Sequence, residues 1–301
     1  MPNLAIRRDR GLGDLLMLTP SLRALTQSGL ADEITIYCNE NLHSVFSGNL
    51  HVHQVKPSKL YQDEAGQYDR VVDLNGYPER QEDVGALSRV YLLARGLGVE
   101  SCLDSDNTHL DFYLREDACR QATELLVGLT RPFITLSPFS RDDRRSWGVS
   151  QVQHFVDLCR QQGIGVIFTH SNDCYEDLSC TMLGGVRRFW GLDTHVLAAI
   201  LFYASCVVSV DTGVYHLAVA AGGGVCPPLV LPFASTDPCV QMEPYEHMVT
   251  YAGVGVPDCM HYPCAAGVIT GCHREAHEKL SCTREIPAEA VFEQVVNFLE
   301  L

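Results

Sequence analysis

The chain has 301 residues, with 22 lysines and arginines against 37 aspartates and glutamates, which gives a formal net charge of −15. Because it is 46% hydrophobic and only 20% charged, it can build a large core, which excludes a disordered segment, a collagen-like repeat and a small disulfide-held scaffold. The acidic excess, without any long run of basic residues, argues against nucleic acid as a partner.

The longest apolar stretch, residues 196–210, contains Ser205 and is shorter than the roughly 20 residues that cross a bilayer. It indicates a buried helix that runs into a buried strand. At the N-terminus the charged residues follow the apolar run, which is the reverse of the order in a secretory signal. We therefore expect no transmembrane segment and a cytoplasmic location.

Short β-branched runs alternate with helical patterns in the first part of the chain. The strand-like segments are residues 4–7, 33–38, 52–55 and 70–74. The helical segments are residues 15–27, 84–97 and 116–129. Alternation of this kind predicts the α/β class with a mainly parallel sheet.

The pattern breaks at residues 129–132 and then repeats. The later strand-like segments are residues 133–136, 165–169, 186–190, 206–210 and 229–233. Helical stretches are expected from Val152, Cys174, Thr194 and Tyr215. We predict two Rossmann-like domains, residues 1–130 and 131–301, that face a central cleft.

A glycine-rich turn, Gly11-Leu12-Gly13-Asp14, joins the first strand to the first helix. It is not a dinucleotide fingerprint, because that motif requires a glycine where Leu16 stands. Asp14 has two interpretations. It either caps the helix or acts as a general base that takes a proton from an attacking hydroxyl.

Three polar residues and a glycine follow the strand at 206–210, at the strand end where parallel sheets bind ligands. They are Asp211, Thr212, Gly213 and His216. A hydroxyl, a glycine and a histidine at a helix start are able to hold a diphosphate, or they are a helix cap and a core histidine.

The loop after residues 133–136 carries a mixed-charge segment, 140–147, which is either a solvated turn or a phosphate site. Arg145 is suited to bidentate phosphate contact. Two phosphate-compatible loops in one half and a carboxylate in the other suggest a donor with a diphosphate leaving group and a hydroxyl acceptor. This combination is typical of glycosyl transfer.

Segment 11–20 reads Gly-Leu-Gly-Asp-Leu-Leu-Met-Leu-Thr-Pro, and segments 142–147, 211–220 and 233–238 follow it in order. Together they resemble glycosyltransferase family 9, the ADP-heptose heptosyltransferases, over nearly the whole chain. The resemblance implies a GT-B fold, a nucleotide-sugar donor such as ADP-heptose bound by the second domain, inverting transfer and no catalytic metal. The implied acceptor is a lipopolysaccharide core or a protein serine or threonine.

The resemblance also implies roles for single residues. Asp14 is expected to be the base, Arg145 to contact the donor phosphate and Glu176 to meet the nucleoside. The expected donor-binding residues are Gly13, Ser140, Arg145, Glu176, Asp211, Thr212, Gly213 and His216. The chain departs from the family pattern at Ala234, Ser235 and Leu192, which bears on donor identity.

The segment from 253 to 282 is rich in glycine, proline, cysteine and histidine and lacks periodicity, and Pro287 after it is expected to start a last helix. Its cysteines are Cys259, Cys264, Cys272 and Cys282. Four thiolates suit a structural tetrahedral zinc or iron site, whereas free thiols or a disulfide are the alternatives. Some relatives in the family, the protein heptosyltransferases, carry an iron site of this kind.

A transferase is the leading prediction, and two other functions remain open. The first is a non-catalytic module on the same fold that binds a nucleotide or a partner, which the altered residues at 233–236 favour. The second is a nucleotide-sugar isomerase on a GT-B scaffold, whose motifs are absent from the sequence. Acidic proteins of this size often form homo-oligomers, and the sequence leaves the oligomeric state open.

Overall fold

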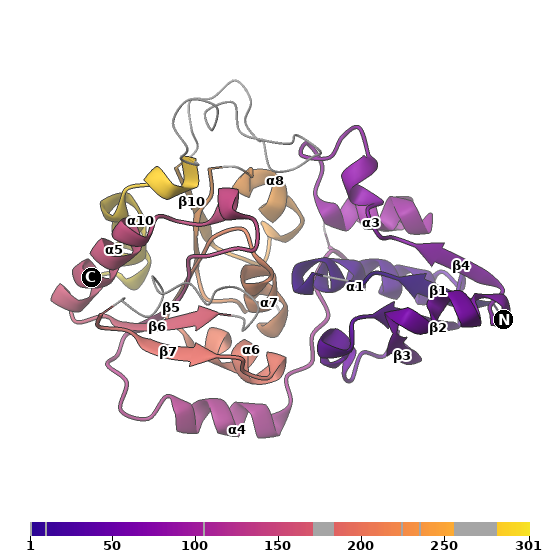
Figure 1. Cartoon of the computed structure of the whole chain (residues 1–301), viewed down its shortest axis with the longest axis horizontal. Helices are drawn as coiled ribbons and strands as arrows, with labels where there is room; N and C mark the ends of the chain where they lie inside the picture. Colours follow the sequence, from indigo (N-terminus) through magenta and orange to yellow (C-terminus); the bar gives the residue numbers. More distant parts are fainter. Residues whose placement is uncertain are drawn as a thin grey trace.

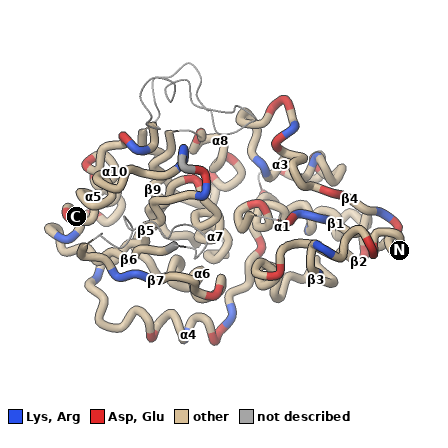
Figure 2. The backbone as a smooth tube through the Cα atoms, in the orientation of Figure 1, with Lys and Arg blue, Asp and Glu red and all other residues tan. Residues whose placement is uncertain are grey.

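The computed structural model describes residues 2–9, 11–104, 106–170, 184–223, 225–234, 236–255 and 282–301. These residues form two parallel β-sheets, one in each half of an elongated molecule (Figure 1). Acidic and basic residues are interspersed along both halves (Figure 2). None of the helices in the described ranges is long and apolar enough to cross a membrane.

The first sheet has the order β3-β2-β1-β4, and all its neighbouring strands are parallel. Its strands are β1 (Asn3–Arg7), β2 (Glu33–Cys38), β3 (Gln54–Pro57) and β4 (Arg70–Asp73). Helices α1 (Leu12–Gln27) and α3 (Arg89–Leu97) pack against each other. The shorter segments are η1 (Glu40–Phe46), η2 (Ser58–Leu60), α2 (Tyr61–Glu64), η3 (Ala65–Gln67), η4 (Pro78–Arg80) and η5 (Glu100–Cys102).

The second sheet has the order β10-β9-β8-β5-β6-β7 and is also parallel. Its strands are β5 (Phe133–Ser137), β6 (Gly165–His170), β7 (Arg187–Trp190), β8 (Cys206–Ser209), β9 (Leu229–Pro232) and β10 (Tyr251–Val254). The residues of β5, β8 and β9 are all buried, as expected for strands covered on both faces.

Helices cover the two faces of this sheet. Alternate strand residues pack with α5 (Val149–Gln161) and α10 (Ala288–Leu299) on one face, and with α6 (Thr194–Tyr203) and α7 (Gly213–Ala221) on the other. The core beneath α6 and α7 continues into the core of the first half. The shorter segments are η6 (Asp143–Arg145), α8 (Pro238–Met242), η8 (Glu243–Tyr245) and η9 (Cys282–Glu285).

The segment between the sheets is fixed to both halves. Arg23 of α1 forms a buried ion pair with Asp111, with 2.6 Å between Nη1 and Oδ2. Helix α4 (Glu116–Leu125) then packs against α6, although it precedes residue 130. The division of the chain into domains at residue 130 stays a prediction.

The predicted α/β class with parallel sheets is confirmed, with local differences. The helix expected at 84–97 begins only at Arg89, because Ser88 has extended backbone angles, φ −60° and ψ 145°. The strand expected at 52–55 lies at Gln54–Pro57. Strand β10 was not predicted and includes the first residues of the segment that was expected to form a loop from 253. The helix expected from Cys174 lies outside the described residues.

Helices α1 and α7 come from different halves, and they begin side by side because two glycines meet there. A Cβ atom on Gly213 would lie 2.8 Å from the backbone nitrogen of Gly13 and 2.8 Å from Cβ of Leu12. A Cβ atom on Gly13 would lie 2.7 Å from Cδ2 of His216. The close approach therefore requires both residues to lack a side chain.

We expect Gly213→Ala to lower the free energy of unfolding by about 1–3 kcal/mol, because the added methyl group meets the backbone nitrogen of Gly13 and Cβ of Leu12, which cannot move without the backbone. Urea unfolding of the variant measures the loss. The matched control is Gly66→Ala, since a Cβ atom at Gly66 has no heavy atom within 4 Å. A Gly213→Ala protein as stable as the control would contradict the contact.

Candidate functional site

A cavity of about 640 Å³ lies between the two halves, where the starts of α1 and α7 meet. Among the predicted site residues that the structure describes, all except Cys282 line this cavity. The lining residues of this set are Gly13, Asp14, Ser140, Arg145, Asp211, Thr212, Gly213 and His216. The structure thus brings together residues that lie up to about 200 positions apart in the sequence.

Asp14 lies in the first turn of α1, whose N-terminal cap is Gly11 with φ 93°. No side-chain hydrogen bond caps this helix, so the capping interpretation of Asp14 does not hold. A side chain on Gly11 would collide with the Asp14 carboxylate, so the glycine leaves room for it. The carboxylate instead contacts two arginines.

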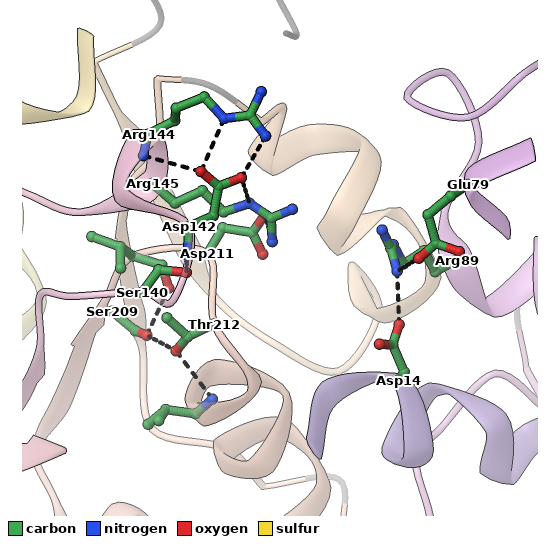
Figure 3. Close-up of polar contacts among 12 residues, drawn as sticks. Asp14, Glu79, Arg89, Ser140, Asp142, Arg144, Arg145, Ser209, Asp211 and Thr212 are labelled. Carbon is green, nitrogen blue, oxygen red and sulfur yellow. Dashed lines mark hydrogen bonds and ion pairs between the residues drawn. The ribbon is translucent and has the colours of Figure 1, made fainter. Parts of the chain in front are cut away.

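Arg8, after β1, and Arg89, at the start of α3, hold the Asp14 carboxylate from two sides. Arg89 Nη1 lies 2.9 Å from Oδ1, and Arg8 Nη2 lies 2.9 Å from Oδ2. Glu79 Oε1 shares both arginines, at 2.8 Å from Arg89 and 3.2 Å from Arg8 (Figure 3 shows Asp14, Arg89 and Glu79). Arg8 is itself fixed, because its Nη1 donates to the carbonyl of Leu74 at 2.8 Å.

The two arginines decide the charge of Asp14. Burial alone would raise its pKa, but Arg89 and Arg8 outweigh burial and hold the pKa below its ordinary value. The pKa of Glu79 is lowered in the same way, against the opposing effect of burial. Both carboxylates are therefore ionised at neutral pH, and two cations balance two anions.

Sequence reasoning missed Arg8, Arg89 and Glu79. Arg89 lies 75 positions from Asp14, and no local pattern links the two. The available signal was the cluster of charges directly after β1 and β4, at the strand ends that face the cleft.

In the second half, the chain leaves β8 through Asp211 and enters α7. Thr212 is the N-terminal cap of α7, and its side-chain oxygen accepts from the Val214 N–H at 3.3 Å. Gly213 follows as the first residue of the helix. Thr212 is therefore a cap, as one interpretation held. Thr212, Gly213 and Val214 line the cavity, so the positive end of α7 lies at its wall.

The loop after β5 brings Arg145 next to the start of α7. Arg145 Nη1 lies 3.3 Å from Oδ2 of Asp211, and its Nε lies 3.7 Å from Oδ2 of Asp142 (Figure 3). Arg144 binds Asp142 more closely, with Nη2 at 2.7 Å from Oδ2. The mixed-charge segment is thus an ordered network at the cavity wall rather than a solvated turn.

Ser140 is buried within the same loop and helps to shape it. Its backbone N–H donates to Oγ of Ser146 at 3.0 Å, and its own Oγ accepts from the Asp142 N–H at 3.4 Å. The loop is anchored further on, because the indole Nε1 of buried Trp147 donates to the carbonyl of Ile286 at 2.8 Å.

His216 is buried, and its ring lies against Gly13 and packs on Tyr245, with 6.2 Å between ring centroids. Burial lowers the pKa of His216 to about 4, although Asp211 and Asp14 oppose the change. The imidazole is therefore neutral at pH 7 and able to donate or accept a hydrogen bond without carrying charge.

Glu176, Cys259, Cys264 and Cys272 lie outside the described residues. Cys282 is described at the start of η9, where it is partly buried. Within the described part of the chain, no group of three or more histidine, cysteine, aspartate or glutamate side chains is arranged to hold a metal ion.

Residues 86–269 match the sequence model of glycosyltransferase family 9 (heptosyltransferase). The chain is similar in structure to a family 9 glycosyl transferase from Veillonella parvula, with a TM-score of 0.76, 15% identity, and coverage of 99% of this chain and 97% of the other. No curated protein matches the sequence.

It is also similar to ADP-heptose lipopolysaccharide heptosyltransferase II of Escherichia coli, with a TM-score of 0.66, 13% identity, and coverage of 100% of this chain and 99% of the other. The iron-containing dodecameric heptosyltransferase TibC of E. coli, solved with ADP-D-β-D-heptose, gives a TM-score of 0.73, 15% identity, and coverage of 99% and 76%. The expected GT-B fold is confirmed by these likenesses.

The neutral state of His216 makes stability depend on pH. Its pKa is about 4 in the folded chain and 6.5 as an ordinary value, so between these values the unfolded chain binds a proton that the folded chain does not. The free energy of unfolding therefore falls as the pH is lowered from 7.5 to 5.0, by roughly 2 kcal/mol from this group. We expect His216→Phe to remove that part of the pH dependence in urea unfolding.

The control for this measurement is His53→Gln, at an exposed histidine outside the cavity. If the free energy of unfolding of His216→Phe depends on pH as strongly as that of the control and of the unmodified protein, His216 is not the neutral buried group described above.

Proposed function

This chain belongs to glycosyltransferase family 9, and from that premise we propose that it transfers heptose from ADP-heptose to a hydroxyl acceptor with inversion at the sugar. The observation that carries the proposal is the cavity between the halves. One wall presents a partly buried, ionised carboxylate, and the other presents an arginine and a helix start.

The second-half wall suits the diphosphate of the donor. Arg145 and the first turn of α7 offer positive charge and N–H donors where the leaving group gains negative charge. Asp211 would repel that charge if it were alone, but its ion pair with Arg145 offsets it. Gly213 allows the phosphate to approach the backbone.

The first-half wall suits the acceptor hydroxyl. Asp14 stays ionised beside Arg8 and Arg89, and these arginines fix its orientation. A carboxylate with a low pKa is a weak base, so the proton moves late, after the new bond to the sugar has made the hydroxyl acidic. Asp14 and Arg145 line the same cavity from different halves of the chain (Figure 3), so the proposed base and the phosphate-binding arginine come from different walls.

The acceptor we propose is a lipopolysaccharide core or a serine or threonine of a protein. One similar structure supports the first of these acceptors, since it is named as a lipopolysaccharide heptosyltransferase.

We further propose that Cys259, Cys264, Cys272 and Cys282 hold a structural iron or zinc ion, because four thiolates form the ligand set that either metal accepts. The similar structure of TibC is iron-containing. Cys282 opens η9, which packs against η6, the segment that carries Arg145. A metal there would steady the phosphate-binding loop.

The role of Asp14 is tested by Asp14→Asn. We expect turnover to fall roughly 10²- to 10⁴-fold, because general base catalysis is lost, while ADP-heptose binding is kept. ADP release from ADP-heptose is measured with core oligosaccharide and with serine-containing protein as acceptors. Asp73→Asn, at an exposed carboxylate paired with Arg7 outside the cavity, is the control. Unchanged turnover in Asp14→Asn would refute the base.

The metal is tested by elemental analysis and by Cys282→Ser. We expect about one iron or zinc per chain, and we expect the variant and the chelated protein to unfold at lower temperature and to bind ADP-heptose less tightly. Cys102→Ser, at an exposed cysteine outside the cluster, is the control. Less than half an equivalent of metal in protein purified without chelator would contradict the site.

A further inference from the structure

The second-half wall of the cavity follows the carboxyl ends of the strands, so its residues can be ordered by the sheet. In the order of the sheet, the described lining comes from the segments after β9, β8 and β5 and then from the ends of β6 and β7. Asp211 to His216 follow β8, and the Arg145 loop follows β5. The proposed diphosphate site is therefore in the middle of the wall.

The two ends of this wall differ in chemistry. The end after β7 is lined by Phe189 and Leu192, an apolar and aromatic surface that suits a flat base. The end after β9 is lined by Gln241 of α8, an uncharged amide. A nucleotide sugar with its diphosphate at the centre thus has its base toward β7 and its sugar toward α8.

Gln241 is only 8% exposed, yet no hydrogen bond joins its side-chain amide to any residue within the described ranges. Its backbone N–H is used in the helix, donating to the carbonyl of Asp237 at 3.1 Å. Because this amide lines the cavity and is not used by the protein, it is available to donate to and accept from a bound ligand.

Contacts with neighbouring elements fix the helix that carries this amide. Asp237 caps α8, accepting from the Cys239 N–H at 2.9 Å, and Pro238 packs on Gly253 of β10. Tyr245, which ends η8 directly after α8, packs its ring on His216 of α7. Gln241 is therefore on a fixed helix next to the start of α7.

We propose that Gln241 recognises a hydroxyl group of the donor sugar and so determines which sugar the enzyme accepts. This inference rests on the proposed function. An amide both donates and accepts a hydrogen bond, as a hydroxyl does, and it carries no charge. Gln241 therefore favours a neutral sugar with a hydroxyl at that point over a deoxy or acidic sugar.

The experiment compares ADP and ADP-heptose binding by calorimetry in the unmodified protein, Gln241→Met and Gln241→Glu. Methionine keeps the volume of the side chain and removes the hydrogen bonds. We expect Gln241→Met to bind ADP-heptose about tenfold or more weakly and ADP unchanged. ADP-heptose analogues that each lack one sugar hydroxyl are then compared. The analogue that lacks the recognised hydroxyl should bind the unmodified protein and Gln241→Met equally weakly. Gln161→Met, at an exposed glutamine at the end of α5, is the control.

The outcomes separate the two proposals. If Gln241→Met weakens the binding of ADP as much as that of ADP-heptose, the recognition role is overturned. The same holds if it weakens the binding of neither ligand, and in both cases the donor assignment stands. If the unmodified protein binds ADP-heptose no more tightly than ADP, the proposed function fails and this inference fails with it. Gln241→Glu provides a second variant, which should weaken ADP-heptose selectively because a carboxylate cannot donate.

Discussion

The contact between Gly13 and Gly213 fixes the geometry on which the rest of the site depends. Helices α1 and α7 belong to different halves of the chain, and their first residues meet with no side chain between them. Two helix starts bring unpaired N–H groups and positive helix ends to one point. That point lines the cavity, and helix starts of this kind bind anionic groups such as phosphates.

Charge balance at the cavity is compatible with the anionic donor that we propose for this strongly acidic chain. Arg8 and Arg89 balance Asp14 and Glu79 on one wall, while Arg144 and Arg145 balance Asp142 and Asp211 on the other. His216 between them stays neutral because it is buried. These carboxylates of the cavity walls are therefore paired with arginines, although the chain as a whole is acidic. Each carboxylate is oriented by at least one arginine.

The sequence predicted the elements and residues that local chemistry determines. The alternation of apolar strands and helices marked both sheets, and the motif segments marked Asp14, Arg145 and the start of α7. It did not predict Arg89 or Gln241, because neither is set apart by its neighbours in the chain. Their importance comes from tertiary contacts, over 75 positions for Arg89 and Asp14. The start of α3 was also missed, since Ser88 is extended for reasons that no periodicity reveals.

The most direct measurement is thermal unfolding of the purified protein with ADP, ADP-heptose, and UDP-, GDP- and dTDP-linked sugars, in the unmodified protein and in Arg145→Ala. A ligand that binds the native state raises the unfolding temperature. We expect ADP-heptose to stabilise more than ADP or the other nucleotide sugars, and Arg145→Ala to lose most of that effect while Arg120→Ala, at an exposed site on α4, keeps it. No stabilisation by any nucleotide sugar, or full stabilisation of Arg145→Ala, would contradict a donor held at the start of α7.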